Sequence, residues 1–97
     1  MILFDHPRTC FHRRRRRQTA HLMSDIVGWN GTGELVQFAR ALGLKDEWIQ
    51  FPGTEKEHYD LFDGAIKRAR EAGATEVSSV ELIKRVVQPK RAVRESG

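Results

Sequence analysis

The sequence has few of the residues that would place it in a specialised class. Its 97 residues include one cysteine, which excludes an internal disulfide. No apolar run approaches the roughly 20 residues that a membrane-spanning helix needs. The short apolar start precedes its positive charge, the reverse of a secretory signal. We therefore expect a soluble, cytoplasmic protein that makes no membrane contact.

Motifs of the common catalytic families are also missing. Residues 28–33 are rich in glycine, but neither a following Lys-Ser/Thr pair nor the spacing of a nucleotide-binding loop is present. Ser24 lacks the flanking glycines of a nucleophile elbow and is interpreted as a turn hydroxyl. These absences disfavour a P-loop, dinucleotide-binding or serine-hydrolase function.

The pattern of apolar residues predicts an α/β fold. Short apolar runs indicate strands at residues 2–4, 20–23 and 75–77, and helical spacing indicates three helices with Thr32, Asp60 and Ser78 as N-cap residues. A chain of this length holds one core. We expect a single small domain over residues 1–88, with a three- or four-stranded sheet packed against about three helices.

Positive charge is concentrated at the two ends of the chain. Residues 1–17 hold six arginines and one aspartate, net +5, and residues 83–97 hold five basic residues and one glutamate, net +4. The segment between them holds six basic and eleven acidic residues, net −5. Residues 8–18 show no apolar period, so we expect a basic loop or arm there and a basic C-terminal tail at 89–97.

Two basic ends suggest a polyanionic partner, either nucleic acid or an acidic protein surface. An exposed tryptophan in the glycine-rich loop could stack on a base or mark a protein interface. A solvated arm without a partner is one alternative, and a homo-oligomer, with the arm of one copy on the acidic body of another, is a second. The candidate contact residues are Arg8, Arg13, Arg14, Arg15, Arg16, Arg17, Trp29, Lys90 and Arg91.

Two clusters pair a histidine with a carboxylate. His21 and Asp25 lie four residues apart, His58 and Asp60 lie two apart, and Asp5 would be nearby if the strands pair. Imidazole and carboxylate together suit Zn²⁺, Mn²⁺ or Fe²⁺, so a divalent metal is the one cofactor that the sequence suggests. The alternatives are a metal-free acid–base pair, or local capping of a turn and a helix by the two aspartates.

Four blocks of the sequence match a known pattern. They are His21-Leu22-Met23-Ser24-Asp25, Glu34-Leu35 to Gly43-Leu44, Glu57-His58-Tyr59-Asp60-Leu61, and Ala72-Gly73-Ala74 with Val77-Ser78-Ser79-Val80-Glu81-Leu82. Over about residues 20–86 the chain therefore resembles the small bacterial and phage domain-of-unknown-function family 4031 (DUF4031). The resemblance implies the fold outline, the choice of polar positions and a phage or bacterial origin, and it implies no activity.

Two functions remain. The favoured one is a basic-armed binding protein, not an enzyme, that engages nucleic acid or a nucleic-acid-handling protein, for example as an inhibitor of host defence. Its residues are recognisable without assuming a fold. The alternative is a small metal-dependent hydrolase that acts on a nucleotide or nucleic acid through the two histidine–aspartate clusters. The two functions differ in whether the clusters meet in space.

Overall fold

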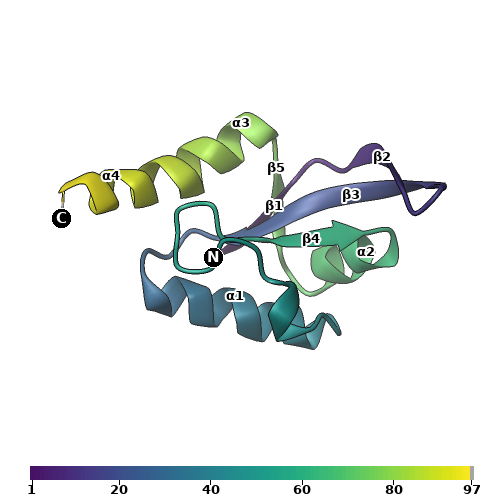
Figure 1. Ribbon diagram of the computed structural model, residues 1–97, viewed down its shortest axis with the longest axis horizontal. Helices are drawn as coiled ribbons and strands as arrows, with labels where there is room; N and C mark the ends of the chain where they lie inside the picture. Colours follow the sequence, from purple (N-terminus) through teal and green to yellow (C-terminus); the bar gives the residue numbers. More distant parts are fainter. Residues whose placement is uncertain (97) are drawn as a thin grey trace.

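The computed structural model describes residues 1–96 and shows one mixed sheet with helices on both faces (Figure 1). The α/β prediction is confirmed, but the sheet has five strands, so the expected three or four was too few. The strands are β1 (Ile2–Asp5), β2 (Arg8–His12), β3 (Arg15–Ser24), β4 (Tyr59–Phe62) and β5 (Thr75–Val77). The helical elements are α1 (Trp29–Ala41), the 3₁₀ turn η1 (Asp46–Trp48), α2 (Gly64–Glu71), α3 (Ser79–Leu82), the π-helical η2 (Ile83–Val87) and α4 (Gln88–Ser96).

Strand β3 is the centre of the sheet. β1 and β2 follow each other along one of its edges, because only His6 and Pro7 separate them, and β4 pairs with its other edge. All three pairings are antiparallel, whereas β5 adds to β1 in parallel. The long central strand therefore brings the first, second and fourth strands together.

The two faces of the sheet carry separate cores. Leu22 and Leu61 are fully buried on the face covered by α1 and α2, whereas Leu3 and Met23 pack beneath α3 and η2 on the other face. Fully burying a side chain of this size stabilises the fold by roughly 1.5–3 kcal/mol. Since side chains alternate along a strand, His21 stands on the same face as Met23, beside the C-terminal helices.

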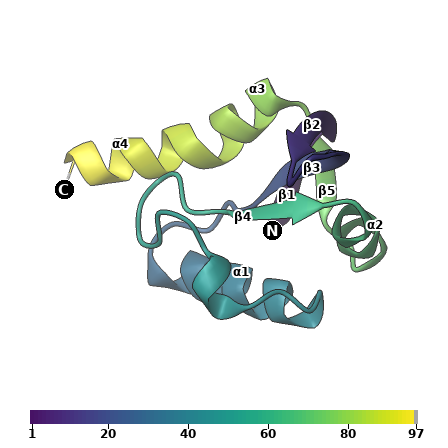
Figure 2. The same cartoon turned by 45° about the vertical axis from the view of Figure 1, so that its right-hand side comes forward.

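The basic loop or arm predicted at residues 8–18 is instead ordered as a β-hairpin. β2 pairs with β3 from Arg8 opposite Thr19 to His12 opposite Arg15, which leaves a two-residue turn. Both turn residues, Arg13 and Arg14, have positive φ (51° and 63°), as a type I′ turn requires. The hairpin projects from one end of the molecule (Figures 1 and 2).

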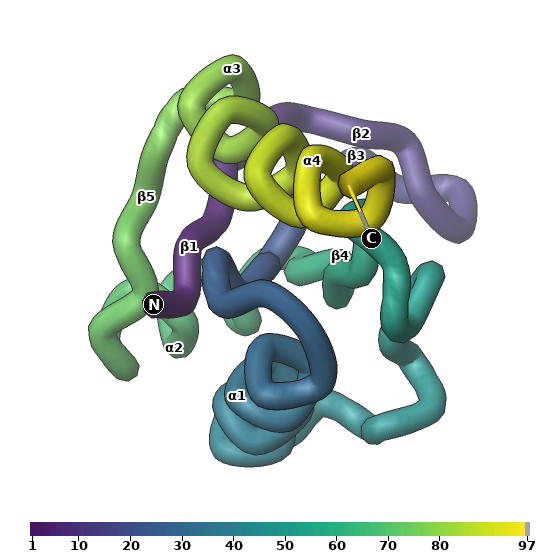
Figure 3. Tube along the Cα trace, turned by 90° about the vertical axis from the view of Figure 1, so that its left-hand side faces the viewer, coloured from purple at the N-terminus to yellow at the C-terminus, as the bar shows by residue number. Residues whose placement is uncertain are grey.

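The C-terminal segment also differs from its prediction. We expect the last helix to stop before Pro89, but it continues to Ser96, and Gly97 lies outside the described residues. The π-helical turn η2 comes directly before α4, and such a change of hydrogen-bond spacing accommodates a proline that has no N–H to donate. Seen end-on, α4 lies across the sheet from α1, and the segment between η1 and β4 reaches it (Figure 3).

Two of the three predicted N-caps are misplaced. α1 begins at Trp29 after Gly28 rather than after Thr32, and α2 begins after Asp63, because Asp60 belongs to β4. The third is confirmed, since the Ser78 hydroxyl accepts a hydrogen bond from the backbone N–H of Glu81 at 3.1 Å. Within residues 1–96, no helix is both long and apolar enough to cross a membrane.

Candidate metal centre

The pairing of β3 with β4 brings the two histidine–aspartate clusters together. His21 lies opposite Asp60 in the ladder, and His58 lies two residues before Asp60, bridged to Gln50. Tyr59 and Leu61 point into the core, so the residues between and beside them face outward. His21, His58 and Asp60 each offer one ligand atom, and these three atoms lie within 4.8 Å of one another.

A hydrogen bond to Nδ1 of each histidine fixes the orientation of its imidazole ring. His58 Nδ1 lies 2.7 Å from the carbonyl oxygen of Lys56, and His21 Nδ1 lies 3.0 Å from Asp5 Oδ2. Both oxygens accept, so each Nδ1 donates a proton, and in the neutral imidazole Nε2 then holds the lone pair; Nη2 of Arg8 lies 3.4 Å from that of His21. Metal-binding histidines are commonly oriented by hydrogen bonds of this kind.

One separation already matches coordination of a single ion, and a second is longer, so His21 would move closer on binding. His58 Nε2 lies 3.3 Å from Asp60 Oδ1, and His21 Nε2 lies 4.0 Å from the same oxygen. Two ligands of a tetrahedral zinc with bonds of 2.0–2.1 Å are about 3.3 Å apart. The other oxygen of Asp60 accepts a hydrogen bond from the side-chain amide of Gln50, which holds Oδ1 towards the histidines.

Asp5 is the buried support of this cluster, and a β-bulge explains its position. Residues 5–7 lie opposite only two residues, 20 and 21, of β3. Asp5 Oδ1 takes the role of a backbone acceptor there, receiving the N–H of His21 at 2.7 Å, while Oδ2 holds the ring. Burial alone would raise the pKa of Asp5, but these bonds outweigh it and lower that pKa, and the bond to Asp5 raises the pKa of His21.

Asp25, the fourth predicted ligand, does not join the cluster. β3 ends at Ser24, and the Asp25 carboxylate turns away to the amino group of Met1 at 2.8 Å. Of the alternative acid–base pairs, His58 contacts Asp60, whereas the partner of His21 is Asp5 rather than Asp25. The cluster therefore comprises two imidazoles, one carboxylate and one supporting carboxylate.

Basic residues surround the cluster in two adjoining depressions. One, of about 490 Å³, contains His21 and His58 and is lined by the cations Arg8, Lys56 and Arg91. The guanidinium of Arg8 lies against the ring of His21, with Nη2 3.3 Å from Nδ1. A second depression of similar size, about 490 Å³, lies on the other side of Asp60 and is lined by Arg13 and Arg17 of the hairpin.

The other predicted contact residues are spread over the surface. Arg13, Arg14, Arg15 and Arg16 are exposed and form no ion pair with any residue of the described part, 1–96. Arg17 is held in place, since its Nε donates to Asp63 at 2.7 Å and its guanidinium lies 4.7 Å from the centre of a phenylalanine ring. Trp29, 77% exposed, and Lys90, buried, both line a third cavity away from the cluster.

Two contributors to the site were not singled out from the sequence, Lys56 and Gln50. Lys56 lies two residues before His58, and its proximity to a candidate ligand was the one signal that could have drawn attention to it. Gln50 approaches Asp60 only through the isolated bridge between residues 50 and 58, which no local pattern marks.

Comparison with known proteins identifies the family and no activity. The family model described as a protein of unknown function, DUF4031, matches residues 2–89. The chain therefore belongs to this family, as the four sequence blocks indicated. Neither a curated protein nor a solved structure matches the chain.

Proposed function

We propose that this DUF4031 member is a divalent-metal-dependent hydrolase that cleaves a phosphate ester of a nucleotide or nucleic acid. One observation carries the proposal: one ligand atom each from His21, His58 and Asp60 converge within 4.8 Å, and both rings are held by bonds to their Nδ1 atoms.

Two imidazoles and one carboxylate fit Zn²⁺, Mn²⁺ or Fe²⁺ and leave coordination positions for water. A bound ion of this kind lowers the pKa of water and makes a hydroxide nucleophile accessible near neutral pH. The ligand residues are 13–33% exposed, so solvent and substrate can reach the position between them. Asp5, with a side chain 4% exposed, would hold His21 without competing as a ligand.

The surrounding cations support a phosphate substrate. Arg8, Lys56 and Arg91 line the depression that contains the histidines, and a phosphate there could accept hydrogen bonds from both guanidinium groups. Leu82, Ile83 and Val87 give the same depression an apolar wall that could support a base or sugar. These residues would bind and orient the ester beside the water-activating centre.

The placement of Asp60 between two basic depressions favours an extended substrate over a free phosphate. A single strand could pass from Arg91 and Arg8 across the cluster to Arg17 and Arg13. Arginines along such a path neutralise successive phosphates without reading sequence. We therefore propose single-stranded nucleic acid as the first substrate class to test.

The test is hydrolysis of a labelled single-stranded oligonucleotide by metal-free protein supplied with Zn²⁺, Mn²⁺ or Mg²⁺. We expect cleavage that requires added metal and is abolished in His58→Ala. His6→Ala is the matched control, because His6 also pairs with a carboxylate, Glu76 at 2.7 Å, but lies outside the cluster. Metal-independent cleavage, or equal activity in His58→Ala and the control, would contradict the proposal.

A second candidate, a nucleic-acid or acidic-protein binding module without hydrolysis, is favoured by the exposed hairpin. Its turn places Arg13 and Arg14 at the tip, with Arg15 and Arg16 directly behind them. Affinity for single- and double-stranded DNA should then fall with salt. Alanine at these four positions should reduce the slope of log affinity against log salt concentration by about 0.7–0.9 for each phosphate that is no longer neutralised. An unchanged slope would exclude this role for the hairpin.

A further inference from the structure

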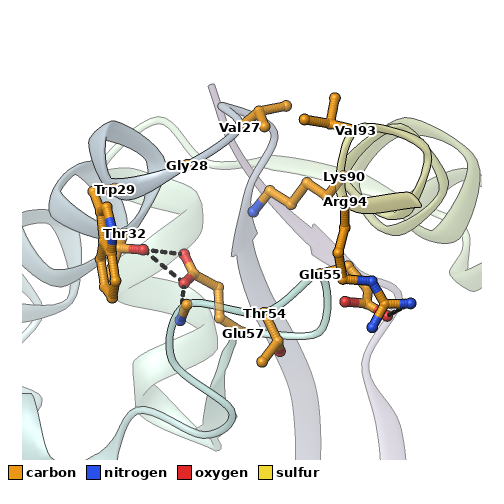
Figure 4. A pocket seen from close by; sticks show the side chains of 11 residues that line it. Val27, Gly28, Trp29, Thr32, Thr54, Glu55, Glu57, Lys90, Val93 and Arg94 are labelled. Carbon is orange, nitrogen blue, oxygen red and sulfur yellow. Dashed lines mark hydrogen bonds and ion pairs between the residues drawn. The ribbon is translucent and has the colours of Figure 1, made fainter. Parts of the chain in front are cut away.

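A third cavity, separate from the metal centre, lies between α1, α4 and the segment before β4. It has a volume of about 200 Å³ and is lined by the start of α1, residues 53–57 and one side of α4. Figure 4 shows the Lys90 side chain extending from α4 into this space, between Val27 and Glu57. The cavity is below the roughly 300 Å³ typical of pockets for drug-sized ligands, so it suits a smaller molecule.

Lys90 is the unpartnered charge of this cavity. It is 7% exposed, and its ammonium makes no hydrogen bond or ion pair with any of residues 1–96. Burial lowers the pKa of Lys90, although the carboxylates of Glu57, Asp25 and Glu34 oppose that effect. The aliphatic part of Lys90 is buried while its ammonium faces the cavity (Figure 4), so a position for an acceptor is open in front of it.

Both oxygens of the Glu57 carboxylate are close to donors, whereas Glu55 is paired through Oε1 and its buried Oε2 has no hydrogen-bond partner among residues 1–96. Glu57 accepts from the Thr32 hydroxyl at 2.7 and 3.0 Å and from the backbone N–H of Gly53 at 2.8 Å. Glu55 pairs with Arg94 at 3.2 Å and with Arg91 at 3.6 Å. Neither carboxylate forms an ion pair with Lys90, so within residues 1–96 its ammonium has no acceptor and is available to one that enters the cavity.

A second feature of the wall also favours an anion. α1 has 13 residues and starts after Gly28, which has no side chain to cap the helix. The first N–H groups of a helix lack intrahelical acceptors and attract negative charge. Gly28 and Lys90 line the same cavity, so the positive end of the α1 dipole and the positive charge of Lys90 both border it.

We infer that this cavity binds a small organic anion, whose acidic group contacts Lys90 and the start of α1. The body of the ligand would lie against the apolar part of the wall, formed by Val27, Val93 and the ring of Trp29. That ring lies over the loop, since a Cβ at Gly53 would come within 3.1 Å of it. The ligand class is thus a small carboxylate with an apolar or aromatic body.

The probe is benzoate, titrated into the full chain by calorimetry, with inorganic phosphate as the second arm. We expect saturable binding of benzoate, weaker binding of phosphate, and an affinity about tenfold or more lower in Lys90→Met, because the variant lacks a hydrogen bond from a charged group. Lys84→Met, at an exposed position of η2, and His58→Ala should bind as the wild type does. Absent benzoate binding, equal binding in Lys90→Met, or phosphate binding as tight as benzoate overturns the inference.

A measurement on the unaltered protein covers the case in which Lys90→Met does not fold. Brief acetylation followed by peptide mass mapping reports the reactivity of each lysine. Benzoate should slow modification of Lys90 and leave that of Lys84 unchanged. Equal protection of both lysines, or of neither, overturns the inference. The metal centre is not involved, so this result is independent of the proposed hydrolase.

Discussion

Replacing Asp5 with asparagine keeps the shape of the side chain and removes one acceptor from the support of His21. In the native protein Oδ1 accepts the backbone N–H of His21 at 2.7 Å and Oδ2 accepts its Nδ1–H at 3.0 Å. Asparagine can accept only one of these. If its oxygen stays on the backbone, its amide faces Nδ1 and favours the tautomer with the proton on Nε2, the atom proposed to bind metal.

Removal of such an orienting partner typically lowers metal affinity 10–100-fold, or about 1.4–2.7 kcal/mol. We expect Asp5→Asn to weaken Zn²⁺ binding by that factor, measured by calorimetry with a competing chelator. Asp25→Asn is the matched control, because Asp25 pairs with the Met1 amino group rather than with the cluster. Wild-type affinity in Asp5→Asn, or an equal decrease in both variants, would refute the proposed role of Asp5.

Three further outcomes follow from the structure. Arg13→Asn with Arg14→Gly supplies residues that favour the observed positive φ values, so the free energy of unfolding should rise by roughly 1–2 kcal/mol. The melting temperature should rise with it, and the salt dependence of DNA binding should decline. A lower melting temperature would contradict the type I′ turn. Leu35→Ala, at a fully buried position on the face of α1 that packs on the sheet, should cost about 2–5 kcal/mol in chemical denaturation and leave the metal affinity of the folded protein unchanged. Because burial lowers the pKa of Lys90, the unfolded chain binds that proton more tightly than the folded chain. The stability of the wild type should therefore rise with pH up to the ordinary lysine pKa. Lys90→Met should be more stable than the wild type near neutral pH, and the difference should decline in alkaline solution.

Elements with a clear apolar period could be predicted, and those without one could not. The spacing of Leu35, Ala39 and Leu42 marks α1, and Ser78 marks the start of α3, because local packing and capping determine both. The arginine hairpin has no alternation of apolar and polar residues, and its turn uses Arg-Arg where Asn-Gly is usual. Its two strands, β2 and the first half of β3, pair with each other, and Arg17 is held by Asp63, a contact that is distant in sequence.

The site was predictable as a set of residue types but not as a geometry. His21, His58 and Asp60 stand out by chemistry, but their convergence depends on the β3–β4 register, which pairs residues 39 positions apart. Asp25 was included because it lies four residues from His21, but β3 ends at Ser24 and the chain then turns its carboxylate to the amino group of Met1. The burial of Lys90 depends on α4 continuing through Pro89, against the usual effect of proline.

The central claim is that His21, His58 and Asp60 bind one metal ion. The most direct measurement is anomalous X-ray diffraction from crystals of the protein grown with Zn²⁺ or Mn²⁺. We predict one strong peak about 2.0–2.2 Å from Nε2 of both histidines and Oδ1 of Asp60. No peak between these three atoms, in crystals where the same ion is ordered elsewhere, would contradict the claim.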